Sequence, residues 1–145
     1  MKALRRLVSI FGLLAALLLA GMVLPAVAQE MDHLHVNVDI KPGGYPNVIN
    51  LKSKGLVPVA LLGSADFDVL TADTGTVAFG RMHEGGAAPV KIAYEDVNLD
   101  GYLDIVFKFV TQETGLQPGD TEACLHGMLL TGEMFCGHDS VIVIR

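Results

Sequence analysis

Residues 90–109 read V-K-I-A-Y-E-D-V-N-L-D-G-Y-L-D-I-V-F-K-F, and this stretch decides the fold. Apolar and polar side chains alternate before position 96 and again after position 104. Such alternation is typical of a half-buried β-strand, whose successive side chains point to opposite faces. The stretch therefore predicts two strands joined by a loop at residues 96–104.

This loop places an oxygen donor at every second position around a central glycine. Calcium takes about six to eight hard oxygen ligands in flexible geometry, whereas magnesium needs a rigid octahedral site and keeps its waters. Gly101 stands where the loop must turn, because glycine takes a positive φ without steric cost. The loop therefore predicts a Ca²⁺ site. Its ligands would be the side chains of Asp96, Asn98, Asp100 and Asp104 and the backbone carbonyl of Tyr102.

The same residues have two other interpretations, an EF-hand and an ordinary polar turn. An EF-hand needs flanking helices and a glutamate at its twelfth position, but that position is Phe107 here and the flanks alternate as strands. An ordinary polar turn stays open, since Asp, Asn and Gly all favour turns. The loop does not complete a calcium shell alone, and Glu113, Asp120 and Glu122 are candidates for a further ligand.

The first 28 residues have the pattern of a secretory signal peptide. A basic start is followed by an almost wholly apolar run over residues 7–24 and by an A-x-A motif ending at Ala28. An uncleaved membrane anchor is the alternative, because the run approaches the length of a membrane span. We expect cleavage before Gln29 and a single domain over residues 29–145, exported to the periplasm or outside the cell.

The charge of the chain excludes several partners. The formal net charge is −6 at pH 7, and loss of the leader removes three basic residues, Lys2, Arg5 and Arg6. An acidic chain is poorly suited to nucleic acid or to an anionic membrane. We therefore expect no nucleic-acid partner and, after cleavage, no membrane contact.

The remaining chain predicts more short strands and no long helix. Strand patterns separated by turn residues cover residues 35–41, 48–51, 56–62, 76–79, 123–130, 134–136 and 139–144, with one helical turn over 69–74. Many short strands with turns between them favour a β-sandwich. The predicted fold is a single all-β sandwich, Greek-key or immunoglobulin-like.

Cys124 and Cys136 are the only cysteines, and in an exported protein a disulfide is the default. A two-residue turn at Thr131-Gly132 would place Cys124 opposite Asp139, three residues beyond Cys136. A bridge would then need a bulge, for which Gly137 is available. The alternative is a pair of buried thiols acting as small apolar groups.

Other polar groups give weaker signals. His33 and His35 share a strand face and form a pair that can bind zinc or copper, but a solvated polar face explains them better. Asp66, Asp68 and Glu113 are the carboxylates available to a hydrolase, although a turn-capping aspartate is the commoner role. No nucleophile elbow, zinc-protease motif or phosphate loop is present in the sequence.

Several segments resemble a small domain that is common in secreted bacterial proteins of unassigned function. They are V-D-I-K-P-G at 38–43, I-N-L-K-S-K-G-L-V-P-V-A at 49–60, D-V-N-L-D-G at 96–101 and T-Q-E-T-G at 111–115. The loop is also similar to those of dockerins, thrombospondin calcium repeats and integrin-type propeller blades. Leu99 departs from that family, which usually has glycine or a smaller residue there. The resemblance implies a secreted β-domain with a calcium loop near adhesion modules, and no established activity.

Together these features predict a secreted, non-enzymatic, calcium-stabilised β-sandwich. It would bind a protein or glycan at the cell surface or in the matrix. A structural fibre subunit that pairs through the strand at residues 35–41 is the alternative, and a carboxylate-dependent hydrolase is a more remote one.

Overall fold

The computed structural model describes residues 25–26, 32–82 and 85–145. Apart from Pro25 and Ala26, the predicted leader lies outside the described residues. A compact unit spans Asp32–Arg145 and holds all of the described strands and buried core, so it can be produced by itself. In the described part of the chain, no helix has the length and apolar character needed to cross a membrane.

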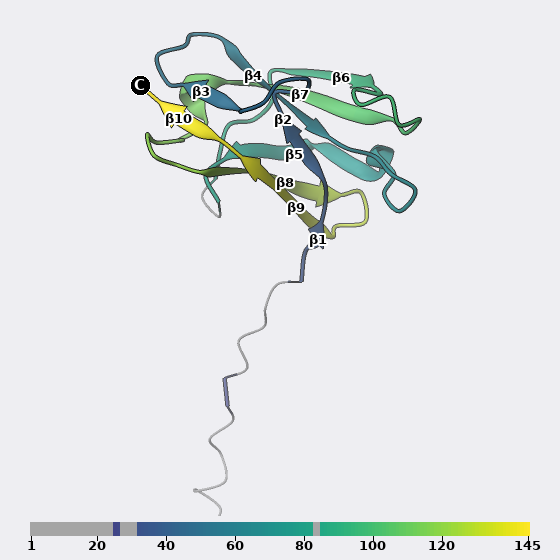
Figure 1. Ribbon diagram of the computed structural model, residues 1–145. Helices are drawn as coiled ribbons and strands as arrows, with labels where there is room; N and C mark the ends of the chain where they lie inside the picture. Colours follow the sequence, from purple (N-terminus) through teal and green to yellow (C-terminus); the bar gives the residue numbers. More distant parts are fainter. Residues whose placement is uncertain (1–24, 27–31, 83–84) are drawn as a thin grey trace, which may run out of the picture. The chain divides into compact units, whose positions relative to one another are not determined.

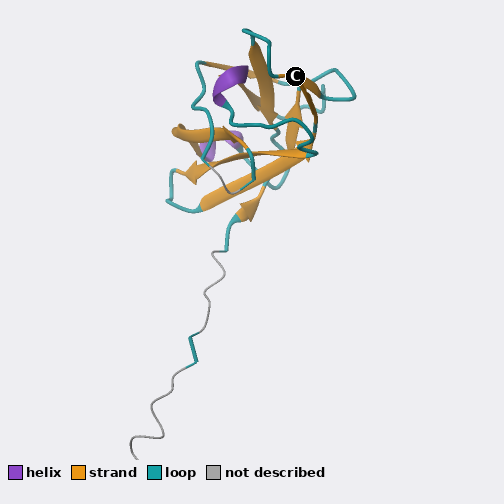
Figure 2. Cartoon of the chain, turned by 90° about the vertical axis from the view of Figure 1, so that its left-hand side faces the viewer, coloured by secondary structure: helices purple, strands orange, loops and turns teal. Residues whose placement is uncertain are grey.

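Strands dominate this unit, and they form two four-stranded sheets and one two-stranded sheet (Figure 1). The strands are β1 (Leu34–His35), β2 (Val38–Ile40), β3 (Val48–Asn50), β4 (Leu56–Leu61), β5 (Ala72–Gly80), β6 (Lys91–Glu95), β7 (Asp104–Val110), β8 (Glu122–Leu129), β9 (Met134–Ser140) and β10 (Ile142–Ile144). Two short 3-10 helices, η1 (Val69–Thr71) and η2 (Thr111–Glu113), connect strands (Figure 2). The strand orders are β1-β9-β8-β5, β2-β4-β7-β6 and β10-β3. The predicted all-β class is confirmed.

The two larger sheets pack against each other through one hydrophobic core (Figure 1). Phe107 and Phe109 of β7 and Phe79 of β5 are fully buried, and the rings of Phe79 and Phe109 have centroids 5.2 Å apart. Alternate residues of β4, β7 and β8 reach this core, which is the pattern predicted from the alternating sequence, whereas β6 contributes no core residue. The result is a β-sandwich in which most of the apolar surface lies between the sheets.

Strand β4 lies between β2 and β7, which explains why residues 56–62 are apolar on both faces. Pro58 has no N–H, and its carbonyl accepts a hydrogen bond from Lys41 N at 2.8 Å. The nitrogen and carbonyl of one strand residue point the same way, so the missing donor faces the end of β2, which stops at Ile40. Pro58 therefore removes no hydrogen bond between β4 and β7.

The single strand predicted over residues 35–41 is wrong in detail. The chain pairs with β9 as β1, then crosses to the other sheet and pairs with β4 as β2. The crossing is fixed by long-range hydrogen bonds: Val36 N donates to Cys136 O at 3.1 Å, and Leu62 N donates to Asn37 O at 2.9 Å. Apolar and polar residues alternate in the same way in both halves of residues 35–41, so the sequence did not show the change of sheet.

Candidate metal centre

The predicted calcium loop joins β6 to β7 at one end of the β2-β4-β7-β6 sheet (Figure 1). The two strands pair in continuous antiparallel register from Lys91 opposite Lys108 to Glu95 opposite Asp104. The loop therefore begins at Asp96, directly after the last pair. The predicted strand–loop–strand arrangement is confirmed, and no EF-hand helix flanks the loop.

Asp104 is the most buried polar group of this loop, with 0% of its surface exposed. Its Oδ1 accepts a hydrogen bond from Gly63 N at 2.8 Å, and its Oδ2 accepts one from Val97 N at 2.9 Å. One carboxylate thus joins the start of the loop to the chain that follows β4. A Cβ atom at Gly63 would lie 2.2 Å from Leu103 O, so only glycine permits this approach.

Asp96 and Asp100 point their carboxylates at backbone amides of the same loop. Asp96 accepts from Asp100 N at 3.2 Å through Oδ1 and from Gly101 N at 2.8 Å through Oδ2. Asp100 Oδ1 accepts from Tyr102 N at 2.9 Å. Each carboxylate oxygen has more than one lone pair, so these bonds orient the donors while leaving acceptor capacity.

Two residues turn the chain within the loop. Gly101 has φ +91°, as expected for the central glycine, and Leu99 has φ +57°. A left-handed conformation costs an L-residue other than glycine about 1–2 kcal/mol. The side chain of Leu99 is 88% exposed, so no packing offsets this cost. The loop therefore keeps a strained backbone conformation at Leu99.

The oxygen donors fit a hard cation in kind, but they do not converge fully. Within residues 25–26, 32–82 and 85–145, no three His, Cys, Asp or Glu side chains are arranged to hold a metal ion. Two of the suggested additional ligands have other partners. Asp120 forms an ion pair with Arg81 at 3.1 Å, and Glu122 lies 4.0 Å from His138. Rotation of the exposed Asn98 and Asp100 side chains would be needed to close a shell.

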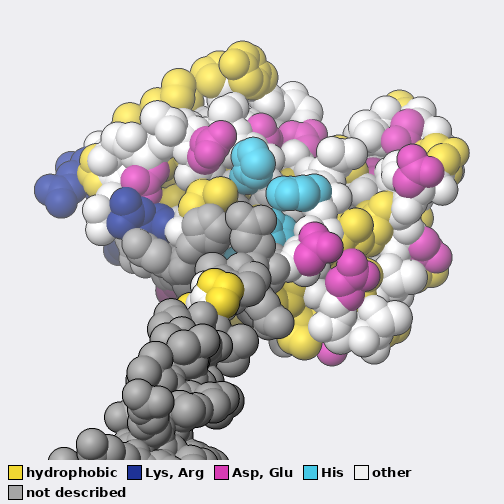
Figure 3. Space-filling model, turned by 90° about the horizontal axis from the view of Figure 1, so that it is seen from below, with side chains coloured by type: hydrophobic (Ala, Val, Ile, Leu, Met, Phe, Trp, Pro, Cys, Tyr) yellow, Lys and Arg dark blue, Asp and Glu magenta, His cyan; other side chains and the backbone are white. Residues whose placement is uncertain are grey.

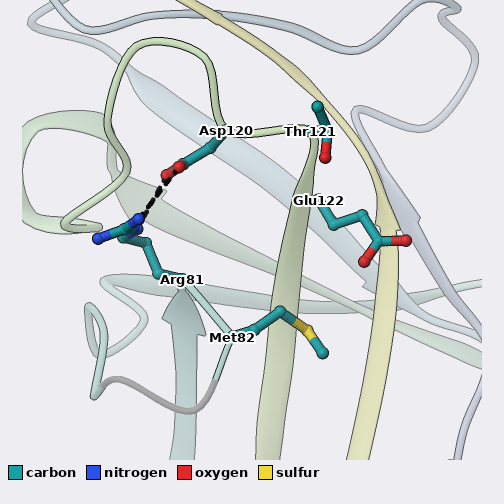
Figure 4. A pocket seen from close by; sticks show the side chains of 5 residues that line it. All are labelled: Arg81, Met82, Asp120, Thr121 and Glu122. Carbon is teal, nitrogen blue, oxygen red and sulfur yellow. Dashed lines mark hydrogen bonds and ion pairs between the residues drawn. The ribbon is translucent and has the colours of Figure 1, made fainter.

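The Arg81–Asp120 pair lines a small open hollow of about 230 Å³ together with Met82, Thr121 and Glu122 (Figure 4). The two partners stand 39 positions apart in the sequence. Asp120 also accepts from Gln117 N at 2.8 Å, so its carboxylate orders its own turn as well. The sequence did not predict this pair, because a contact between segments far apart in the chain produces no recognisable local motif.

The two cysteines are neighbours across β8 and β9. Their Sγ atoms lie 2.8 Å apart, and both are free thiols in this structure. The expected register is wrong by one residue, since Cys124 is opposite His138 and not Asp139. The turn between β8 and β9 holds three residues rather than two, and Gly132 within it has φ +89°. The extra residue shifts the register, so Cys124 and Cys136 are diagonal neighbours and lie closer together than the two-residue turn would place them. Burial and the contact with Cys136 raise the pKa of the Cys124 thiol to about 12.

The histidines lie mostly on one face of the β1-β9-β8-β5 sheet. His35 and His126 are both opposite Cys136, which places all three side chains on the same side of the sheet. The rings of His33 and His35 have centroids 4.8 Å apart. Figure 3 shows histidine side chains gathered beside acidic ones on the face seen from below. On this face His35 and His138 are exposed, His33 and His126 are partly buried, and Cys124 is buried.

The three carboxylates available to a hydrolase lie outside the β6–β7 loop. Asp68 caps η1, because its Oδ1 accepts a hydrogen bond from Leu70 N at 2.9 Å. This is the turn-capping role that the sequence favours for a loop aspartate. Asp66 is exposed beside it, and Glu113 ends η2.

Sequence reasoning missed Asp139. Its Oδ2 accepts from Ile40 N and from Asn47 Nδ2, each at 3.0 Å, which ties β9 to β2 and to the turn before β3. Burial and the charge of Asp139 raise the pKa of Asp39 above its ordinary value.

Comparisons with protein-family models, with curated proteins and with solved structures found no match to this chain. The resemblance drawn from the sequence motifs therefore stays a prediction.

Proposed function

We propose that this chain is an exported, calcium-stabilised β-domain that binds a protein or a glycan at the cell surface or in the matrix. The observation that carries the proposal is the β6–β7 loop. Its aspartates accept hydrogen bonds from backbone amides at the end of a regularly paired hairpin, and one of them, Asp104, is fully buried. Three carboxylates in so short a loop repel one another, and a divalent cation would remove that repulsion.

Calcium would be held by Asp96, Asn98, Asp100, Asp104 and the carbonyl of Tyr102, with water completing the shell. The ion supplies positive charge and a cross-link between the two ends of the loop. Because the unfolded chain has no such site, binding adds to the free energy of unfolding. At a free calcium concentration 100 times the Kd, the gain is about 2.7 kcal/mol.

A binding role is favoured over catalysis by the use of the carboxylates. In the loop they accept backbone hydrogen bonds, and Asp68 caps a helical turn. At these positions the carboxylates stabilise the backbone conformation. The hollow beside Arg81 and Asp120 and the one beside His35 and His138 are open to solvent, as suits contact with a larger partner.

Calcium titration of the unit Asp32–Arg145 tests the metal. We expect one site by isothermal titration calorimetry and a melting temperature that is higher in millimolar Ca²⁺ than in EDTA. The Asp100→Ala variant should lose both effects. Asp66→Ala is the matched control, since Asp66 is an exposed aspartate outside the loop. Equal melting temperatures in Ca²⁺ and EDTA for the unmodified unit would reject calcium.

The binding role needs a separate test. The same unit, immobilised and screened against glycans and surface proteins with Ca²⁺ and with chelator, should retain at least one ligand in a calcium-dependent manner. Turnover of a glycan or peptide by the pure unit would instead favour a hydrolase.

A further inference from the structure

Strand β6 is a regular, uncovered sheet edge. Among the strands that the structure describes, it pairs only with β7, through five consecutive residue pairs without a register shift. Its residues Lys91–Glu95 are all exposed and include no proline or glycine. Proteins normally protect such edges with bulges, prolines or very short strands, because a free edge pairs with other chains.

The other edges of the two larger sheets are protected in these ways. β1 has two residues and β2 has three. β5 changes register between Asp73 and Ala78, and Ala87 pairs with Phe79. Among the described strands, β6 is therefore the edge best suited to pairing with another strand (Figure 1).

Apolar side chains on β6 are left half covered. Ile92 and Tyr94 are 42% and 51% exposed, although they stand opposite Phe107 and Ile105, which are fully buried. Val90, directly before the strand, is 53% exposed. The hydrophobic core thus opens to solvent along this edge. A strand added beside β6 would cover these side chains.

The sequence of β6 is complementary to itself when two copies run antiparallel. With Ala93 on the two-fold axis, Lys91 lies opposite Glu95 of the second copy, and Ile92 lies opposite its Tyr94. The axis repeats both pairs, which gives two opposite-charge pairs and two apolar pairs, each favourable across strands. Parallel pairing would put Lys91 opposite Lys91. A one-residue slip would put charged side chains on the apolar face.

We propose that β6 pairs antiparallel with β6 of a second copy of this chain, in the register centred on Ala93. The two β2-β4-β7-β6 sheets then form one continuous sheet with the short β2 strands at its ends. Such a two-fold contact uses the same edge on both copies, so the assembly closes as a dimer and does not extend into a fibre. The pairing involves no loop ligand and is independent of the calcium proposal.

Charge reversal tests both the edge and the register. In sedimentation velocity, the unit Asp32–Arg145 should show a concentration-dependent monomer–dimer equilibrium in EDTA and in Ca²⁺. Lys91→Glu places like charges opposite each other twice, and we expect the dimer Kd to rise about tenfold or more. Glu95→Lys should do the same. The double variant Lys91→Glu/Glu95→Lys restores both pairs and should return the Kd to within about threefold of the original.

Lys54→Glu is the matched control, because Lys54 is exposed in a loop and the change in net charge is the same. It should leave the Kd unchanged, and far-UV circular dichroism should show that all variants remain folded. A unit that stays monomeric at millimolar concentration overturns the proposal. So does a double variant as weak as the single ones, and so do open polymers in place of dimers.

Discussion

Replacement of Asp104 by alanine should destabilise the domain even without calcium. The carboxylate accepts hydrogen bonds from Gly63 N and Val97 N and is completely buried. Alanine would leave both N–H groups without this partner, in a space that water does not freely enter. An unsatisfied buried donor costs about 1–3 kcal/mol, so we expect the loss of the partner of two donors to cost about 2–6 kcal/mol. This is a large fraction of the roughly 5–15 kcal/mol that stabilises a typical domain.

Urea denaturation of the unit Asp32–Arg145 in EDTA, followed by circular dichroism, measures this loss directly. Asp100→Ala is the comparison, because Asp100 is exposed and accepts one local hydrogen bond, from Tyr102 N. In EDTA it should cost no more than about 1 kcal/mol. In Ca²⁺ its deficit should grow, since the ligand is lost as well. The two variants therefore separate the structural role of the loop from its metal role.

A free energy of unfolding for Asp104→Ala within about 0.5 kcal/mol of the unmodified unit in EDTA would refute the reasoning. It would mean that water replaces the carboxylate, and that the β6–β7 hairpin is not fixed to the chain after β4. A large deficit for Asp100→Ala in EDTA would show instead that the exposed half of the loop is structural.

Three further predictions concern single groups. Leu99→Gly should stabilise the domain by about 0.5–1 kcal/mol in urea denaturation, because it relieves a positive φ on an exposed side chain, and a loss of stability would contradict the strain. Asp39→Asn should raise stability at pH 7. The pKa of Asp39 in the folded domain lies above its ordinary value of 3.8, so the free energy of unfolding of the unmodified domain rises as the pH falls from above the folded pKa toward 3.8. The Asp39→Asn variant has no carboxyl group at this position and should lack this rise. In the reduced native unit, Cys124 should be alkylated much more slowly than Cys136 at pH 8, because its pKa is raised to about 12 and the thiolate is the reactive form. Peptide mass spectrometry of the alkylated unit measures the two rates, and equal rates for Cys124 and Cys136 would contradict the prediction.

The all-β fold could be predicted because its strands carry a local signal. Val57, Val59, Phe107 and Phe109 alternate with other residues along the chain, and in the structure they enter one core. The change of sheet between β1 and β2 has no such signal. Its cause is a set of hydrogen bonds to β9 and to the end of β4, which lie far away in sequence.

The candidate site was predictable to a similar degree. The spacing of Asp96, Asp100 and Gly101 predicted one loop between two strands, and the contacts of these residues are local. That the loop binds calcium stays a prediction. The partner of Asp104 was not predictable, since Gly63 stands 41 positions earlier and occupies an ordinary loop. Asp139 was missed for the same reason, as its partners lie 92 and 99 positions away.

The bond between Asp104 and Gly63 also bears on the free edge of the sheet. A two-stranded hairpin is only marginally stable by itself, so the position of β6 depends on what holds β7 and the loop. β7 pairs with β4 from Ile105 to Val110, and Asp104 fixes the end of the hairpin to the chain that leaves β4. The exposed strand is thereby kept in register with β7 up to Glu95, the residue that would face Lys91 of a second copy. A flexible hairpin would lose conformational entropy on pairing, whereas this one is already ordered, and so the same carboxylate that shapes the loop lowers the cost of adding a strand.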